Sequence, residues 1–73
     1  METTTVRDFY NRILGYIEEQ HNGDKTARDF YRRILGRYDK KANVTRDFYG
    51  RIISKGDTTM GLILNNAMND SKK

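Results

Sequence analysis

The sequence has no cysteine and only one histidine. Neither a disulfide bond nor a structural zinc site is therefore expected to reinforce the fold. A chain of 73 residues buries only a modest share of its surface, so its core must be thin. We expect one domain, residues 1–73, stabilised by regular hydrogen bonding and a small apolar layer.

Long apolar runs are also missing. No segment approaches the roughly 20 consecutive apolar residues of a membrane span, and the first five residues do not resemble the start of a signal peptide. We therefore expect a cytoplasmic protein without a membrane partner. The formal net charge of +4 permits nucleic-acid binding without requiring it.

What the sequence does contain is a repeat. The tetrapeptide Arg-Asp-Phe-Tyr occurs at 7–10, 28–31 and 46–49, and each copy continues into a similar apolar tail. As a helix, one copy would place Phe30, Ile34 and Tyr38 on one side. That interpretation places a glycine inside each of the three helices, at about 1 kcal/mol each.

A tight-turn interpretation explains more of the repeat, and we favour it. Aspartate is preferred at the first position of a type I turn, because its carboxylate accepts a hydrogen bond from the backbone two residues later. Asn11 and Gly50 then occupy a left-handed position that closes a three-residue hairpin loop with a bulge, and Arg32 suits that position least well. The same loop predicts three opposite-charge pairs across the hairpins, namely Asp8–Arg12, Asp29–Arg33 and Asp47–Arg51.

The predicted fold is mainly β: an antiparallel meander of three hairpin repeats, about six strands, with one C-terminal α-helix packed on the sheet. The repeat units cover about residues 3–19, 24–39 and 43–55. Asn22-Gly23 is a strong hairpin-turn signal between the first two units. The helix is predicted at about 58–69, with an apolar stripe of Met60, Ile63, Leu64, Ala67 and Met68.

Strict alternation along the strands predicts two partly apolar faces. One face would carry Ile13, Gly15, Ile17, Ile34, Gly36, Tyr38, Val44 and Ile52, and the other Val6, Leu14, Tyr16, Ala27, Leu35 and Ile53. A single helix covers only one face of a sheet, so self-association as a homodimer is a hypothesis for the second.

The unit Asp-Phe-Tyr-Gly-Arg-Ile-Ile, with Gly15 and Gly36 closing the first two copies, resembles bacterial hairpin-repeat proteins of the form Asp-x-x-Gly-Arg-(Ile/Val)-x-Gly. The likeness covers about residues 5–55, and the chain departs from the pattern at Asn11, Arg32 and Ser54. The resemblance implies hairpins joined into an extended sheet, and it implies no activity.

A meander brings the three Asp-Phe-Tyr turns to one end of the sheet, about 10 Å apart. The predicted binding residues are the rings at these turns and the arginines beneath them: Phe9, Tyr10, Phe30, Tyr31, Phe48, Tyr49, Arg7, Arg28 and Arg46. Such a row suits stacking on bases or sugars, or docking of a protein. The alternative is that each ring folds back and extends the core.

No catalytic residue, cofactor or metal is predicted. His21 lies beside the Asn22-Gly23 turn and is interpreted as an exposed turn residue, because nothing in the spacing makes acidic ligands converge on it. Carboxylates beside arginines stay ionised and are poor proton carriers. Alternation places Arg7, Arg28 and Arg46 on one face of the sheet and Arg12, Arg33, Arg37 and Arg51 on the other, so the charge is spread over both faces. We therefore expect a small non-enzymatic interaction or structural module with an unknown protein partner, and a nucleic-acid-binding module as the alternative.

Overall fold

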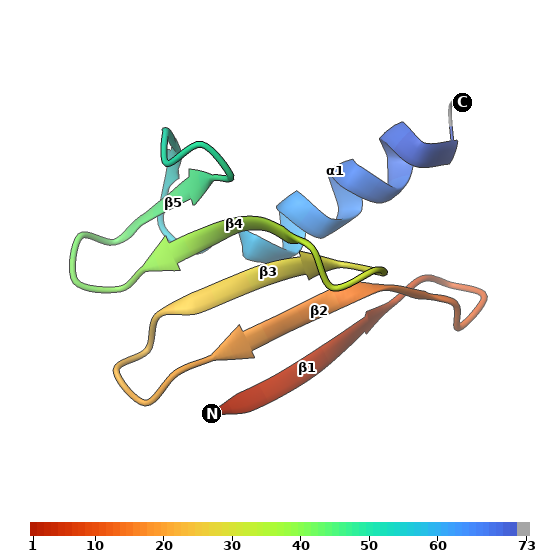
Figure 1. The fold of residues 1–73 in the computed structure, drawn as a ribbon, viewed down its shortest axis with the longest axis horizontal. Helices are drawn as coiled ribbons and strands as arrows, with labels where there is room; N and C mark the ends of the chain where they lie inside the picture. Colours follow the sequence, from red (N-terminus) through yellow and green to blue (C-terminus); the bar gives the residue numbers. More distant parts are fainter. Residues whose placement is uncertain (72–73) are drawn as a thin grey trace.

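The computed structural model describes residues 1–71, with side chains described for residues 1–68. Six strands form one antiparallel sheet in the order β1-β2-β3-β4-β5-β6, and a helix follows them (Figure 1). The elements are β1 (Glu2–Arg7), β2 (Ile13–Glu19), β3 (Lys25–Asp29), β4 (Ile34–Asp39), β5 (Val44–Asp47), β6 (Ile52–Lys55) and α1 (Thr59–Ser71). The predicted meander with a C-terminal helix on the sheet is thus confirmed.

Each repeat forms one hairpin, and each hairpin contains a β-bulge next to its turn. In the first hairpin Val6 pairs with Gly15 whereas Arg7 pairs with Ile13, so Leu14 is the extra residue. The second and third hairpins repeat this shift between Ala27 and Arg28 and between Thr45 and Arg46. A bulge of one residue reverses the alternation of side chains beyond it.

The predicted division of the sheet into two faces is wrong because of these bulges. Gly15 lies opposite Val6, and Ile17 opposite Ala27, so these residues share the face that packs against α1. On the other face Tyr16 pairs with Arg28, and Arg28 pairs with Ile34. We call this second side the open face.

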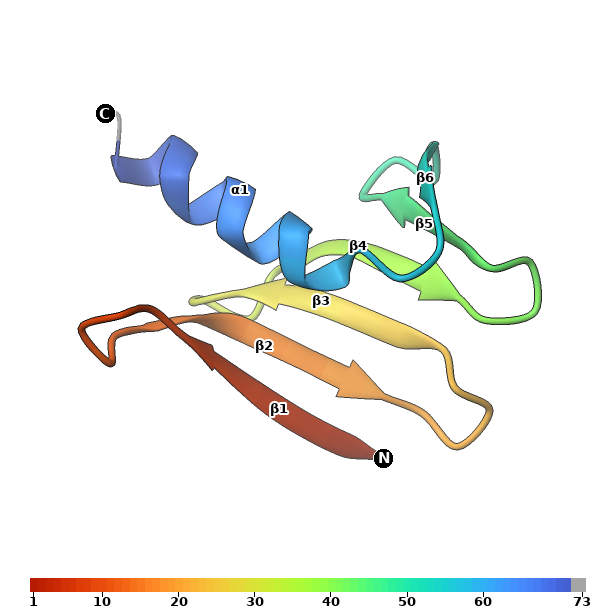
Figure 2. The same ribbon diagram turned by 180° about the vertical axis from the view of Figure 1, so that it is seen from behind.

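The helix α1 lies across β2, β3 and β4 (Figure 2). Its Ile63 is completely buried with Val6 and Ala27, and Leu14, Ile17, Leu35 and Leu62 pack around them. A side chain at Gly15 would overlap the Arg28 carbonyl oxygen of β3 and Ile63 of α1, and one at Gly36 would overlap the Arg46 carbonyl oxygen of β5 and Leu62 of α1. The two repeat glycines therefore let the helix approach the sheet closely.

The side of α1 that packs on the sheet is not the side that carries the predicted apolar stripe. Ile63 faces the sheet as expected, but Met60, Leu64 and Met68 are 46%, 44% and 60% exposed. The helix instead buries Thr59 and partly buries Leu62. Its contact is thus made by residues that fit between the glycines, and an apolar stripe stays on the outside.

The start of α1 is fixed by hydrogen bonds. The Asp57 carboxylate accepts from the Thr59 amide (3.1 Å) and the Thr59 hydroxyl (2.7 Å), and Lys25 Nζ lies 2.6 Å from its other oxygen. Partial burial alone would raise the pKa of Asp57, but the bonds from Lys25 and Thr59 hold this pKa below its ordinary value of 3.8. In β5, Thr45 Oγ1 donates to the Gly56 carbonyl (2.7 Å) and accepts from the Thr58 amide (3.1 Å).

Candidate binding surface

The three Asp-Phe-Tyr loops are built in the same way. In the first, the Asp8 carbonyl accepts from the Asn11 amide (3.0 Å) and the Asp8 amide donates to the Arg12 carbonyl (2.9 Å). The carboxylate of Asp8 accepts from the amides of Tyr10 and Arg12, both at 2.9 Å, and from Arg12 Nε at 2.8 Å. The aspartate therefore holds the turn from inside.

The predicted pairs of this loop are present in all three copies. Nε–Oδ2 distances are 2.8 Å for Arg33–Asp29 and 2.9 Å for Arg51–Asp47. Asn11, Arg32 and Gly50 have φ of 67°, 68° and 83°, the left-handed conformation that the turn interpretation requires. Arg32 thus adopts the same backbone as its counterparts, although side-chain-bearing residues rarely do.

Two of the loop aspartates, Asp8 and Asp47, are held in their ionised form. Mainly because the Arg12 amide donates to it, the pKa of Asp8 lies below its ordinary value of 3.8. Desolvation acts to raise the pKa of Asp47, but the Arg51 amide and guanidinium outweigh it and the pKa is lowered. These carboxylates act in the structure of the turns.

The six rings at the turns project into solvent. We call them the aromatic rim, and their exposed fractions range from 54% for Phe30 to 96% for Phe9, with Tyr10, Tyr31, Phe48 and Tyr49 between. Within each loop the two rings meet edge to face, with centroids 5.3 to 5.5 Å apart. The rings do not fold back to extend the core.

Guanidinium groups lie over the tyrosines of the rim. The centroid distances are 5.4 Å for Arg12 over Tyr10 and 5.3 Å for both Arg33 over Tyr31 and Arg51 over Tyr49. A guanidinium within about 6 Å of a ring centre attracts its π face. One face of each tyrosine ring therefore already contacts a guanidinium group, and the rest of the ring is exposed to solvent.

The arginines that precede the loops differ in their partners. Arg7 Nη1 donates to the Asn11 carbonyl (3.0 Å) and Arg28 Nη1 to the Arg32 carbonyl (2.8 Å). Arg28 also forms an ion pair with Glu18, with 2.8 Å between Nε and Oε1. Among the described side chains, Arg46 forms neither an ion pair nor a side-chain hydrogen bond.

The rim is not the straight row that strand spacing predicts. Figures 1 and 2 show the first two hairpin ends close together, and the third set apart from them. Twist accumulates from strand to strand in a sheet, and it turns β5 and β6 away from β1 and β2. The three turns that carry the aromatic pairs therefore do not form one line at the end of the sheet.

Two hollows lie between successive hairpin ends. One of about 350 Å³ is lined by Arg12 from the first hairpin, by Phe30 and Tyr31 from the second, and by Ala67 of α1. Another of about 310 Å³ is lined by Ile34 and Arg37 of the second hairpin and by Arg46 and Phe48 of the third. Each hollow combines aromatic carbon with a guanidinium.

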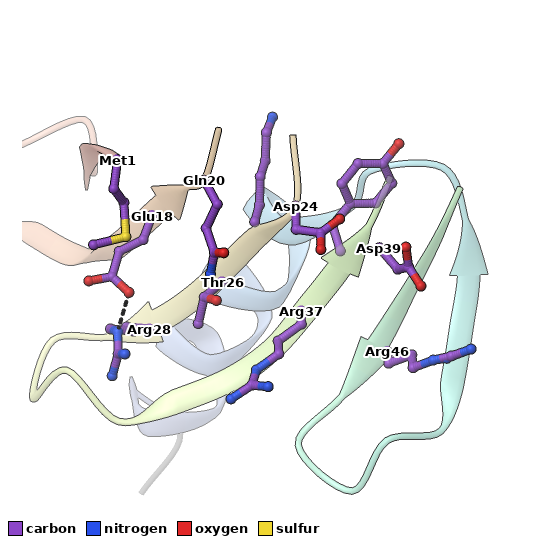
Figure 3. Close-up of a pocket in the computed structure, with 11 residues that line it drawn as sticks. Met1, Glu18, Gln20, Asp24, Thr26, Arg28, Arg37, Asp39 and Arg46 are labelled. Carbon is purple, nitrogen blue, oxygen red and sulfur yellow. Dashed lines mark hydrogen bonds and ion pairs between the residues drawn. The ribbon is translucent and has the colours of Figure 1, made fainter. Parts of the chain in front are cut away.

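Sequence alternation misplaced Arg37. It pairs directly with Arg46 across β4 and β5, on the open face. A polar groove of about 550 Å³ on this face contains Arg28, Arg37 and Arg46, with Glu18 paired to Arg28 (Figure 3). The bulge position was the missing signal, because it decides which arginines share a face.

No other arrangement of reactive groups stands out in the part of the chain that is described. His21 is exposed at its turn, and the side chains described for residues 1–68 include no group of three acidic, histidine or cysteine residues placed to hold a metal ion. No helix among them is long and apolar enough to cross a membrane. No protein-family model, curated protein or solved structure shows significant similarity to the chain.

Proposed function

We propose that this protein is a small non-enzymatic binding module whose contact surface is the aromatic rim. The observation that carries the proposal is the exposure of all six rings, at least 54% in every case. Phenylalanine and tyrosine are not needed to make these turns, because the aspartate and the left-handed residue supply the hydrogen bonds and the backbone shape. Exposed aromatic side chains that recur at equivalent positions are typical of interaction sites.

The construction of the loops favours binding. Each tip is closed by backbone and carboxylate hydrogen bonds between 2.8 and 3.0 Å. A preorganised loop loses little conformational entropy when a partner binds. Phenylalanine and tyrosine add large contact areas with few rotatable bonds. The rim thus presents aromatic side chains with large contact areas on preorganised loops.

Self-association is a second candidate, and a different surface favours it. Met60, Leu64 and Met68 recur every four residues on the outer side of α1 and are 44 to 60% exposed. Such a stripe on an amphipathic helix suits the same stripe of a second copy. Sedimentation showing a monomer at high micromolar concentration would exclude this homodimer.

The rim is tested with the triple variant Phe9→Ala, Phe30→Ala and Phe48→Ala. These side chains are exposed, so the variant should keep the far-ultraviolet circular dichroism spectrum and the unfolding midpoint of the wild type. The matched control replaces the outer stripe of α1, with Met60→Ala, Leu64→Ala and Met68→Ala.

Each protein is immobilised and challenged with an extract that contains proteins, nucleic acids and carbohydrates. We expect specific ligands to be retained by the wild type and by the helix control, and to be lost from the rim variant. Retention of the same ligands by the rim variant and the wild type would refute the proposal.

A further inference from the structure

Positive charge is concentrated at the end of the sheet that bears the rim. Seven of the eight arginines belong to residues 7–12, 28–33 and 46–51, where the acidic residues are three aspartates. The difference of four positive charges equals the formal net charge of the whole chain. The remainder of the protein is therefore neutral overall, and the hairpin ends form its basic pole.

The charge is interleaved with the rings. A guanidinium lies over the tyrosine of each hairpin, between 5.3 and 5.4 Å from its centroid. Both hollows between the hairpin ends combine a phenylalanine of the rim with arginine, at about 350 and 310 Å³. These volumes fall at the small end of the range for ligand sites.

The pair Arg37–Arg46 is a second, independent indication of an anionic ligand. The two residues lie directly opposite each other on neighbouring strands, a position where like charges destabilise a sheet. Neither side chain has an ion-pair or hydrogen-bond partner among the side chains that the structure describes. Figure 3 shows the two guanidinium groups directed away from each other, so that each can contact a separate phosphate of an extended ligand.

From these features we infer that the rim binds single-stranded nucleic acid, an inference that rests on the rim being a binding surface as proposed above. Bases stack on the exposed Phe and Tyr rings, and the phosphates lie against Arg37, Arg46 and the arginines of the hairpin ends. A single strand is favoured over a duplex because its bases have free π faces, whereas those of a duplex are stacked inside.

The test measures fluorescence anisotropy with three labelled probes of equal length: oligo(dT), a blunt duplex, and an abasic chain of the same phosphates. Oligo(dT) should bind at least about tenfold more tightly than the abasic chain, because stacking on each aromatic ring contributes to affinity. That margin should shrink in the Phe9→Ala, Phe30→Ala, Phe48→Ala variant, which removes three of the six rings of the rim.

Charge is tested with Arg37→Gln plus Arg46→Gln, matched by Lys40→Gln plus Lys41→Gln at the opposite end of the sheet. The arginine variant should lower the dependence of log affinity on log salt by about 1.4, since each phosphate contact on a single strand contributes about 0.7. The lysine variant should retain the wild-type dependence.

Equal binding of oligo(dT) and the abasic chain would overturn the inference, since it would show attraction to charge alone. Tighter binding of the duplex, or no binding of any probe, would overturn it too. In that case the experiment with the extract still decides the proposed function. If the wild type retains ligands that the rim variant does not, the rim remains a binding surface for another class of partner. If the rim variant retains the same ligands as the wild type, the proposed function is refuted as well.

Discussion

The hydroxyl of Thr45 links the sheet by hydrogen bonds to the segment that leads into α1, and its removal should lower the free energy of unfolding. Thr45 is completely buried, and its Oγ1 bonds the Gly56 carbonyl and the Thr58 amide on the segment that leads into α1. Thr45→Val keeps the shape of the side chain and deletes both hydrogen bonds. Thr45→Ser keeps the bonds and deletes only the methyl group.

The two variants should lose different amounts of the free energy of unfolding. A net contribution of about 1 kcal/mol for each bond, together with incomplete solvation of the freed groups, gives a loss of roughly 2–3 kcal/mol for Thr45→Val. The missing methyl of Thr45→Ser should cost about 1 kcal/mol. A domain of 73 residues has a total stability of roughly 4–11 kcal/mol, so the valine variant loses a large fraction of it.

Urea unfolding followed by circular dichroism at 222 nm measures both free energies. Thr45→Val should also lower the thermal midpoint by roughly 10–20 °C, at about 4–8 °C per kcal/mol for a domain of this size. If Thr45→Val were as stable as Thr45→Ser, or more stable, the hydrogen bonds would not be what holds α1, and the argument would be refuted.

Three further predictions concern stability. Gly36→Ala should destabilise the fold by about 1–3 kcal/mol because its new methyl group would overlap the Arg46 carbonyl oxygen of β5 and the Leu62 side chain of α1, whereas Gly61→Ala, in open space, should stabilise it by up to about 1 kcal/mol; equal urea midpoints would contradict this. Asp29→Asn should cost about 1.5 kcal/mol or more, because Asp29 is only 2% exposed, and more than Asp8→Asn in the equivalent loop; the reverse order would show that burial does not matter there. Because the pKa values of Asp8 and Asp57 are lowered from 3.8 by folding, the stability they add is complete well above that pH and is lost as the pH falls below it; a thermal midpoint unchanged between pH 7 and pH 2 would contradict this.

The turns could be predicted from the sequence because their determinants are local. An aspartate with a left-handed residue three positions later specifies a hairpin loop without reference to the rest of the chain. The loop also fixed the pairing of Asp8 with Arg12 and its two counterparts, which the structure confirms. Strand number and order follow once the turns are known.

The faces and the basic pole could not be predicted in the same way. The bulge at Leu14 and its equivalents reverses alternation, and nothing in the local sequence shows which residue of Ile13-Leu14-Gly15 is the extra one. The rotation of α1 depends on where Gly15 and Gly36 open the sheet surface, a tertiary property. The bulge is also the reason why Arg37 was assigned to the wrong face of the sheet.

If the aromatic rim binds as proposed, the repetition of one loop on a single sheet makes that binding multivalent. When one tip engages an extended ligand, the other two are held near it at a high effective concentration, so contacts that are weak one at a time combine into useful avidity. The twist of the sheet, which separates the third hairpin end from the first two, then limits which ligands can contact all three. A flexible chain can follow the twist, whereas a rigid ligand cannot.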